Sequence, residues 1–249
     1  MGARTVLVTG VSRRAGIGFA IARRLLADGH RIVVHSWSAH DAEQPWGSDD
    51  LAAVLAELGD PPHVASDLAD SLAPARVVRE ARSLAGPLDA LVANHARSSS
   101  GGLAEVTAAE LDRSFAVNTR ATVLLVQAFA AQHRGATGEG AVVLMTSGQH
   151  RGAMPGELAY VLSKGAVQQV TATLAAELAG QGIGVVCVNP GPVDTGYADD
   201  ATRAAVAARF PTGRWTAPHD TADIVAWLTG PAAMALTGTT IDAEHGFRR

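Results

Sequence analysis

Hydrophobic residues follow two alternating patterns along this chain of 249 residues. Short apolar runs of about four to eight residues predict buried strands, and the stretches between them repeat apolar residues at helical spacing. The predicted strands are Thr5–Thr9, Arg31–His35, His63–Ala65, Ala90–Ala93, Val142–Thr146, Val185–Asn189 and a last one near Thr239–Asp242. The predicted helices are Ile17–Asp28, Leu51–Leu58, Leu72–Leu84, Leu111–His133, Leu158–Gly180 and one near Thr221–Thr229.

Strands that are apolar on both faces and alternate with helices indicate a parallel sheet covered by helices on both sides. Neither an internal repeat nor a low-complexity linker divides the chain, so we expect a single α/β domain spanning residues 1–249. Two architectures fit this pattern: a closed eight-fold barrel and an open, doubly wound Rossmann-type sheet of about seven strands.

The first strand-to-helix turn favours the open sheet. Gly10, Gly16 and Gly18 lie between the first predicted strand and the first predicted helix. Glycines let backbone N–H groups approach a phosphate, and a helix N-terminus attracts negative charge there. The turn therefore predicts a dinucleotide site, although the common G-x-G-x-x-G spacing is absent and a plain tight turn is the alternative.

Composition excludes several classes of function. A net charge of −4 argues against nucleic acid or an anionic membrane surface as a partner. The single cysteine, Cys187, cannot form an internal disulfide and predicts a reducing compartment. We find no signal-peptide pattern and no run of about eighteen apolar residues, so we expect a cytoplasmic protein. The nine histidines lack metal-ligand spacing, and no metal is expected.

Four polar residues lie where an open parallel sheet would gather chemistry. Lys164 is the only lysine, and it follows Tyr160 by four positions, so both share one face of a predicted helix. Ser147 follows the strand Val142–Thr146, at the carboxyl edge of the sheet. Asn118 lies inside a predicted helix. Each alone could be a capping, packing or surface residue, but together with the glycine turn they indicate one site.

The sequence resembles the short-chain dehydrogenase/reductase family over essentially its whole length. The motifs that carry the resemblance are Thr9-Gly10…Gly16-Ile17-Gly18, Asp67-Leu68, Asn118, Ser147, Tyr160-Val161-Leu162-Ser163-Lys164 and Pro190-Gly191-Pro192-Val193-Asp194-Thr195. The resemblance implies hydride transfer between a nicotinamide cofactor and a ketone or aldehyde, with 3-oxoacyl reductases as the nearest functional analogue.

The resemblance also assigns the catalytic roles. Tyr160 is the expected general acid or base, and Lys164 is expected to lower the pKa of Tyr160 while holding the nicotinamide ribose. Ser147 is expected to place the substrate oxygen. Asn118 is expected to hold a water that links Lys164 to solvent.

The same resemblance implies a set of cofactor-binding residues. Asp67 is expected to accept from the adenine amino group, and Thr195 to meet the nicotinamide carboxamide. The complete set is Gly10, Ser12, Arg13, Arg14, Gly16, Ile17, Gly18, Ser36, Asp67, Leu68, Asn94, Tyr160, Lys164, Pro190, Gly191, Val193 and Thr195.

The chain departs from the family pattern at three places, and the third concerns the choice of cofactor. The glycine loop is two residues longer than usual, as in enoyl reductases of the same superfamily. Those enzymes place the tyrosine about seven residues before the lysine, where this chain has Glu157, so a carbonyl reductase is favoured. The usual Asn-Asn-Ala-Gly appears as Ala93-Asn94-His95-Ala96, and His95 is expected to be a packing or substrate-pocket residue.

The choice of cofactor depends on charge near the adenosine ribose. The second strand ends at His35-Ser36-Trp37, without an acid to bind a ribose 2′-hydroxyl. Arg13 and Arg14 in the lengthened loop could bind a 2′-phosphate, which favours NADP(H) over NAD(H). Three functions stay open: an NADP(H)-dependent carbonyl reductase, an NAD-dependent alcohol dehydrogenase, and a dinucleotide-binding regulatory protein without turnover.

The substrate end is the least specified part of the chain. We expect His150, Met154 and the segment Asp194–Trp215 to line the substrate pocket, with an apolar wall of Tyr197, Phe210 and Trp215. The part Tyr197–Arg209 is expected to be a mobile lid. The two longest predicted helices are expected to pair in a homotetramer or homodimer, as family members often do.

Overall fold

A computed structural model describes residues 2–133 and 139–248. Seven strands form one sheet in the order β3-β2-β1-β4-β5-β6-β7. All neighbouring strands pair in parallel. Their bounds are β1 (Thr5–Thr9), β2 (Arg31–Ser36), β3 (His63–Ala65), β4 (Ala90–Ala93), β5 (Gly140–Met145), β6 (Ile183–Asn189) and β7 (Thr240–Asp242). The sheet is open and its order reverses between β1 and β4, so the doubly wound Rossmann-type prediction is confirmed and the barrel is excluded.

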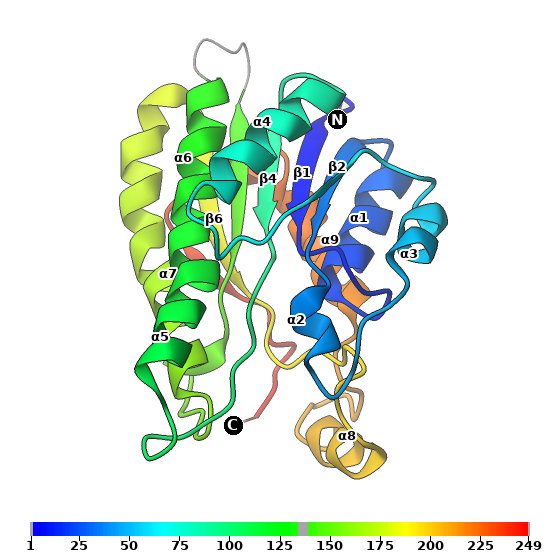
Figure 1. Ribbon diagram of the computed structural model, residues 1–249, viewed down its shortest axis with the longest axis vertical. Coiled ribbons are helices and arrows are strands. Elements are labelled where there is room, and N and C mark those ends of the chain that lie inside the picture. Colours follow the sequence, from blue (N-terminus) through cyan, green and yellow to red (C-terminus); the bar gives the residue numbers. More distant parts are fainter. Residues whose placement is uncertain (1, 134–138, 249) are drawn as a thin grey trace.

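Helices cover both faces of this sheet (Figure 1). The α-helices are α1 (Ile17–Ala27), α2 (Ala39–Ala42), α3 (Leu51–Glu57), α4 (Ala73–Ala85), α5 (Ala108–Ser114), α6 (Ala121–His133), α7 (Leu158–Leu178), α8 (Asp200–Ala207), α9 (Pro218–Leu228) and α10 (Ala232–Ala235). A π-helix, η1 (Phe115–Arg120), joins α5 to α6, and two 3-10 turns are η2 (Gly148–His150) and η3 (Ala179–Gln181).

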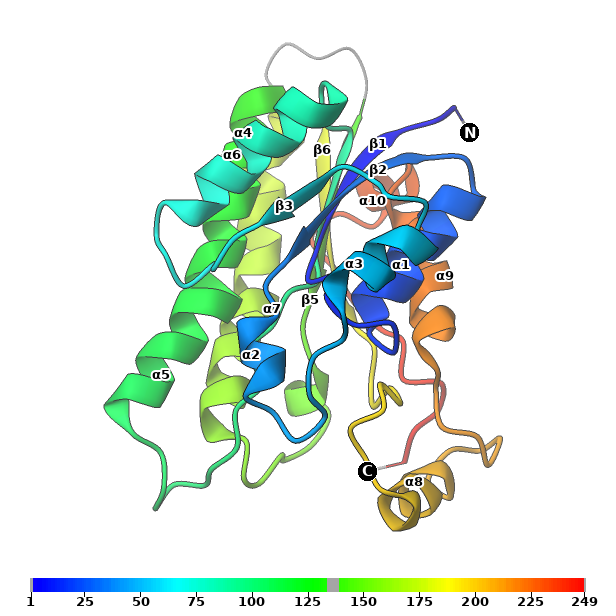
Figure 2. The same cartoon turned by 45° about the vertical axis from the view of Figure 1, so that its right-hand side comes forward.

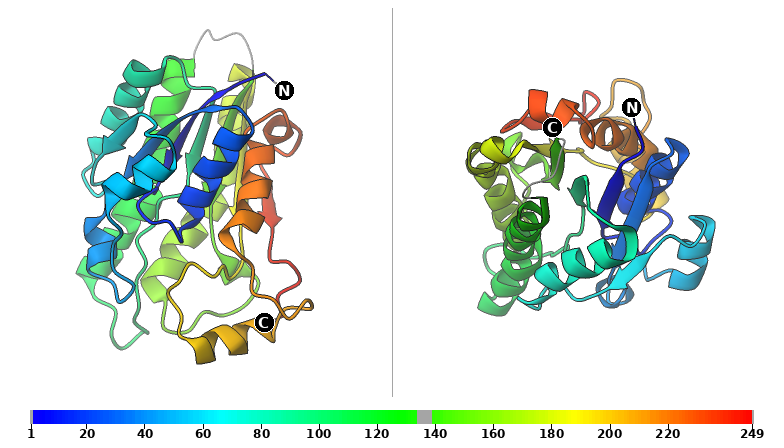
Figure 3. Two further views of the ribbon diagram at one scale, coloured as in Figure 1. Left: turned by 90° about the vertical axis from the view of Figure 1, so that its right-hand side faces the viewer. Right: turned by 90° about the horizontal axis from the view of Figure 1, so that it is seen from above.

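The two layers of helices bury two separate apolar cores. Helices α1, α9 and α10 pack with Val6 and Val8 on one face of the sheet, and α4, α6 and α7 pack with Leu7 on the other. The view from above in Figure 3 shows the sheet between these layers. Successive residues of a strand point to opposite faces, so a central strand buried on both sides must be apolar throughout. This requirement explains the continuous apolar runs of the sequence.

Helix boundaries differ from the predictions where the chain leaves regular α-helix. The predicted helix Leu111–His133 begins earlier, at Ala108, and is interrupted by the π-helix around Asn118. The predicted lid, Tyr197–Arg209, contains α8, whose first turn is capped because the Asp199 side chain accepts from the Thr202 N–H at 2.7 Å. Mobility of that segment stays a prediction.

Two of the short helices lie toward the end of the molecule opposite the start of the chain. In Figures 1 and 2, α8 lies at the bottom and α2 lies in the lower half, between α8 and the sheet. Both helices follow strands, α2 after β2 and α8 after β6, so they lie beyond the carboxyl ends of the sheet. Functional loops of an open parallel sheet gather at this edge.

One glycine lets α10 pack directly on the sheet. A Cβ on Gly184 of β6 would lie 2.4 Å from the carbonyl carbon of Ala233. We expect Gly184→Ala to lower the free energy of unfolding by about 1–3 kcal/mol, because the added methyl overpacks a backbone contact. Gly165→Ala on α7 has no atom within 4 Å of the new methyl. It should raise the unfolding free energy by about 0.5–1 kcal/mol through helix propensity.

Urea denaturation followed by circular dichroism measures both variants. A Gly184→Ala protein as stable as the wild type would contradict the packing described for α10.

Candidate active site

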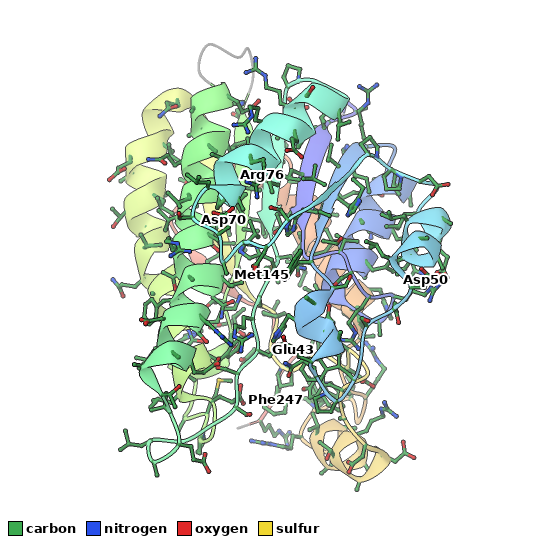
Figure 4. The ribbon with its side chains drawn as sticks, in the orientation of Figure 1. Glu43, Asp50, Asp70, Arg76, Met145 and Phe247 are labelled. Carbon is green, nitrogen blue, oxygen red and sulfur yellow. The ribbon has the colours of Figure 1, made fainter. Side chains whose placement is uncertain are left out.

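A cleft of about 1540 Å³ opens at the carboxyl ends of the strands. In Figure 4, Met145 at the end of β5 lies near the centre of the molecule, Glu43 lies below it beside α2, and Phe247 lies lower still. The cleft joins the glycine turn, α2, the loops after β3 to β6, the start of α7 and the predicted lid. The predicted site residues that line it are Gly10, Ser12, Arg13, Gly16, Ile17, Asp67, Leu68, Asn94, Ser147, Tyr160, Pro190, Gly191, Val193 and Thr195.

Five predicted site residues lie behind or beside the cleft wall: Arg14, Gly18, Ser36, Asn118 and Lys164. Ser36 is buried and its hydroxyl hydrogen-bonds His63 Nε2 at 2.8 Å, so it does not face a ribose. A Cβ on Gly18 would lie 2.2 Å from the Gly10 carbonyl oxygen, so Gly18 lets α1 press against the turn. Ser36 and Gly18 therefore support the cleft wall rather than line it.

The glycine turn is fixed by the loop that follows β4. Gly10 has a φ of 77°, and a Cβ there would lie 2.7 Å from His95 Cα. The Asn94 side chain donates to the carbonyl oxygens of Thr9 and Gly10 at 3.1 and 3.2 Å. Only glycine suits this conformation and this close approach. Asn94 thus shapes the turn while also lining the cleft.

The Thr9 hydroxyl determines the protonation of His95. Thr9 Oγ1 accepts from the backbone N–H groups of Asn94 and His95 at 3.1 and 3.2 Å, which occupies its lone pairs. Its proton can be donated to His95 Nδ1, 2.8 Å away, or to the more distant Val92 carbonyl oxygen at 3.2 Å, and the shorter contact favours His95. His95 Nε2 lies 3.0 Å from the Val117 carbonyl oxygen, which can only accept, so Nε2 carries the ring proton. His95 is therefore a neutral imidazole with both nitrogens used.

His95 connects the glycine turn to the π-helix, and the π-helix connects to the start of α7. Val117 precedes Asn118 in η1, and the Asn118 side-chain N–H groups donate to the Arg97 carbonyl oxygen at 3.0 Å and to Ser163 Oγ at 2.9 Å. Ser163 Oγ donates in turn to the Tyr160 carbonyl oxygen at 2.9 Å. A continuous series of hydrogen bonds thus runs from the glycine turn to Tyr160.

The Asn118 amide is fully engaged by protein groups. Both of its N–H groups donate as described, and its oxygen accepts from the Arg97 backbone N–H at 2.7 Å. Its backbone carbonyl accepts from Thr122 Oγ1 at 2.7 Å. Asn118 therefore acts first as a clamp between η1, α7 and the loop after β4. The predicted water relay to Lys164 stays a prediction.

Tyr160 and Ser147 lie together in the cleft. Burial, with a smaller effect of the Glu157 charge, raises the pKa of Tyr160 to about 12, and a side-chain hydrogen bond with Ser147 opposes this rise. In this structure the effect of burial on the pKa of Tyr160 outweighs the opposing hydrogen bond. The lowering of this pKa by Lys164 stays a prediction. At neutral pH, Tyr160 is protonated and can donate.

Lys164 lies behind Tyr160 and is buried. Its Nζ donates to the Met145 carbonyl oxygen at 2.9 Å and lies 5.8 Å from the centre of the Tyr160 ring. Burial lowers the pKa of Lys164 to about 8, so the ammonium form dominates at pH 7. The lone lysine is thus placed as a buried cation beside the tyrosine ring.

The side chains of the two arginines in the lengthened glycine loop point to different places. Arg14 pairs with Glu57 of α3, and its backbone N–H donates to Asp49, so it turns away from the cleft. Arg13 lines the cleft, donates to the Thr195 carbonyl oxygen at 2.9 Å and lies 5.6 Å from the centre of the Trp46 ring. Arg14 therefore does not line the cleft in this structure.

Helix α2 supplies an acid that the sequence reasoning missed. Asp41 lines the cleft, where its carboxylate accepts from Ser12 Oγ at 2.6 Å and from the Trp46 indole N–H at 3.3 Å. Asp41 lies five residues beyond Ser36, the end of β2, so it is outside the position where the family pattern predicts an acid. The acids Asp41 and Glu43 in this segment are the signal in the sequence.

The substrate end contains fewer of the predicted residues than expected. Met154 and Tyr197 line the cleft. Phe210 and Trp215 are buried behind it, where Trp215 packs edge-on against Tyr197 and Phe210 packs against Phe247. His150 does not line the cleft, because its Nε2 lies 2.8 Å from an Asp242 carboxylate oxygen. The apolar wall therefore consists of Tyr197 alone among its three predicted members.

Metal-binding clusters and membrane-spanning helices are both absent from the part of the chain that the structure describes. Among residues 2–133 and 139–248, no three or more His, Cys, Asp or Glu side chains are grouped to hold a metal ion. Within the same residues, no helix combines the length and apolarity needed to cross a bilayer.

Two buried histidines make stability depend on pH. Burial lowers the pKa of His95 to about 3 and that of His35 to about 4, against 6.5 for an exposed histidine. Between pH 6.5 and 4 the unfolded chain therefore takes up protons that the folded chain does not. The unfolding free energy should fall by several kcal/mol as the pH falls through this range.

Urea denaturation at a series of pH values measures this dependence. His95→Gln should make the fall shallower, and the matched control His219→Gln, at an exposed position, should leave it unchanged. A His95→Gln profile parallel to that of the wild type would show that His95 does not titrate as described.

The chain is similar to known oxidoreductases over nearly its full length. A protein family described as Enoyl-(Acyl carrier protein) reductase matches residues 10–248. An uncharacterized oxidoreductase, YjdA, of Bacillus subtilis is 35% identical over 247 residues, covering 99% of this chain and 97% of that protein. The cyclic-di-GMP-binding biofilm dispersal mediator protein of Escherichia coli is also 35% identical, covering 98% of this chain and 97% of that protein.

The chain is also similar to solved structures over nearly its full length. A short-chain dehydrogenase/reductase from Serratia marcescens shares 31% identity over 98% of both chains, with a TM-score of 0.81. A blue fluorescent protein from a metagenomic library, solved in complex with NADPH, shares 31% identity with a TM-score of 0.84, covering 99% of this chain and 98% of that one.

Proposed function

Because this chain belongs to the short-chain dehydrogenase/reductase family and is an oxidoreductase of that type, we propose that it reduces a ketone or aldehyde to an alcohol with NADP(H). The observation that carries the proposal is the meeting of a protonated Tyr160 and Ser147 in a cleft that the glycine turn also lines. A nicotinamide cofactor supplies the hydride in such a site.

The residues of the cleft suit the proton side of this reaction. Ser147 would donate a hydrogen bond to the carbonyl oxygen and position it. As hydride reaches the carbonyl carbon, negative charge develops on that oxygen, and Tyr160 would supply the proton. An alkoxide is a far stronger base than tyrosinate, so a tyrosine with a raised pKa can still donate to it. The raised pKa favours the reducing direction, because the base needed for alcohol oxidation is scarce at neutral pH.

The spacing of the tyrosine and the lysine favours a carbonyl substrate over an enoyl substrate. Tyr160 lies one helical turn before Lys164, and the position seven residues before Lys164 is Glu157. A carboxyl there cannot replace a tyrosine hydroxyl in that geometry. The name of the matched family is therefore not carried over as the reaction of this chain.

The first test replaces each tyrosine in turn. Tyr160→Phe should retain cofactor binding and lose about 10²- to 10⁴-fold in kcat, because it removes the proton donor. Tyr197→Phe, at the other tyrosine of the cleft, is the matched control and should stay within severalfold of the wild type. Following NADPH absorbance with a panel of carbonyl compounds measures both. Near-normal turnover by Tyr160→Phe would refute the assignment.

The cofactor preference is supported by one residue and opposed by another. Arg13 lines the cleft with a guanidinium that can bind a 2′-phosphate, which favours NADP(H). Asp41 lines the same cleft with a carboxylate that can accept from a ribose 2′-hydroxyl, which makes NAD(H) the second candidate. NADP(H) is the first candidate because one relative is described in complex with NADPH.

Steady-state kinetics with both cofactors tests this choice. Arg13→Ala should raise the KM for NADPH at least tenfold more than the KM for NADH, because only NADPH carries the 2′-phosphate. Arg14→Ala is the control and should change neither, since Arg14 pairs with Glu57 outside the cleft. Two results together would indicate a preference for NAD(H) instead. Arg13→Ala would change the KM for both cofactors equally, and Asp41→Ser would raise the KM for NADH.

Two other functions are distinguished by the same assays. An NAD-dependent alcohol dehydrogenase would turn over faster in the oxidising direction at neutral pH. A dinucleotide-binding regulator would bind a ligand tightly and reduce none of the carbonyl compounds, and the name of the Escherichia coli relative is the observation that favours it. The homotetramer and the cytoplasmic location expected from the sequence stay predictions.

A further inference from the structure

Two polar side chains at the substrate end of the cleft lack a hydrogen-bond partner among the described residues. Glu157 and Ser99 both line the cleft. Among the described residues, no side chain or backbone group donates a hydrogen bond to the Glu157 carboxyl or forms an ion pair with it. The Ser99 hydroxyl oxygen is buried and also lacks a hydrogen-bond partner within the described residues.

Glu157 lies next to the reacting group. It precedes Tyr160 by three residues, and its charge raises the pKa of both Tyr160 and Tyr197. It occupies the N-cap position of α7, yet its side chain does not cap the helix. The carboxyl therefore forgoes the local hydrogen bonds available at a helix start and lies in the wall shared by the two tyrosines.

The backbone holds Glu157 and Ser99 in neighbouring segments. The Gly101 N–H donates to the Gly156 carbonyl oxygen at 2.6 Å, and the Leu158 N–H donates to the Gly101 carbonyl oxygen at 3.2 Å. These bonds join the loop after β4 to the residues on both sides of Glu157, and Ser99 precedes Gly101 by two positions. The two groups thus belong to segments of the cleft wall that backbone hydrogen bonds join.

Leaving such groups without partners costs free energy. A buried hydroxyl without a hydrogen bond costs about 1–3 kcal/mol. Partial burial raises the pKa of Glu157, which shows that its charged form is poorly solvated. An apolar side chain at either position would avoid these costs if the substrate were a plain aliphatic carbonyl compound. A substrate that donates hydrogen bonds would satisfy both groups.

We propose that Glu157, with Ser99, binds a hydroxyl group adjacent to the reacting carbonyl, so that the substrates are hydroxylated ketones or aldehydes. Glu157 accepts from the substrate hydroxyl, and the Ser99 hydroxyl donates to its oxygen. The same carboxylate disfavours substrates with a negative charge beside the carbonyl. This assignment rests on the proposed carbonyl reduction and adds the substrate class that the cleft selects.

A pair of ketones of nearly equal size tests the assignment. Hydroxyacetone and butanone differ by a hydroxyl in place of a methyl group. The wild type should reduce hydroxyacetone with a kcat/KM at least about 100-fold higher, because a site built to bind a hydroxyl discriminates strongly against an analogue without it. Glu157→Leu should bring this ratio to within about threefold of one, and Glu157→Gln, which keeps an acceptor oxygen, should give an intermediate ratio.

A control variant on the same helix accompanies this test, and different results would overturn the Glu157 assignment and the proposed reduction. Glu177→Gln changes an exposed acid on the same helix and should keep the wild-type ratio. Two outcomes would overturn the assignment of Glu157 and leave the proposed reduction intact. One is an equal kcat/KM of the wild type for both ketones. The other is an equal loss of kcat/KM for both ketones in Glu157→Gln and Glu157→Leu. If the protein oxidises NADPH with none of the carbonyl compounds tested, the proposed reduction is overturned, and this assignment is overturned with it.

Discussion

The arrangement of the site depends on the hydroxyl of Thr9. This group ends β1, accepts two backbone N–H groups from the loop after β4, and faces His95 Nδ1 at 2.8 Å. A hydroxyl has one proton and two lone pairs, so these partners use it completely. The glycine turn, the loop after β4 and the neutral His95 ring are therefore fixed relative to one another at a single atom.

From His95 the constraint extends to the start of α7. The His95 ring donates to the Val117 carbonyl oxygen of the π-helix. The neighbouring Asn118 side chain donates to Ser163 Oγ, and Ser163 Oγ donates to the Tyr160 carbonyl oxygen. Each of these groups is buried or partly buried, where an unmade hydrogen bond is costly. Tyr160 and the glycine turn are thus placed by one network, although about 150 residues separate them in sequence.

Regular patterns of the sequence predicted the fold well. The strand Thr5–Thr9 and the strand Ala90–Ala93 have the predicted bounds, because buried parallel strands need continuous apolar runs. The short helices α2 and α8 were missed, since a helix of one or two turns is determined by local caps and contacts rather than by periodicity. The sequence predicts a loop over Gly135–Gly140. Residues 134–138 lie outside the described residues, and Gly140 begins β5.

Spacing predicted which residues meet in the cleft better than it predicted what each one does. Tyr160 and Ser147 line the cleft as expected, but the pKa of Tyr160 is governed by its burial, which no local pattern reveals. Arg13 and Arg14 are adjacent and identical in type, yet only one of them lines the cleft, because Glu57 on α3 engages the other. Such outcomes depend on charges brought from distant segments by the fold.

The most direct measurement follows the hydride itself. The purified protein is incubated with NADPH carrying deuterium at the transferred position of nicotinamide C4 and with a ketone that it reduces, and the alcohol is analysed by mass spectrometry. Hydride transfer within the cleft predicts one deuterium on the carbinol carbon of every product molecule and none from the solvent. An alcohol without the label, or deuterium lost to water, would contradict the account.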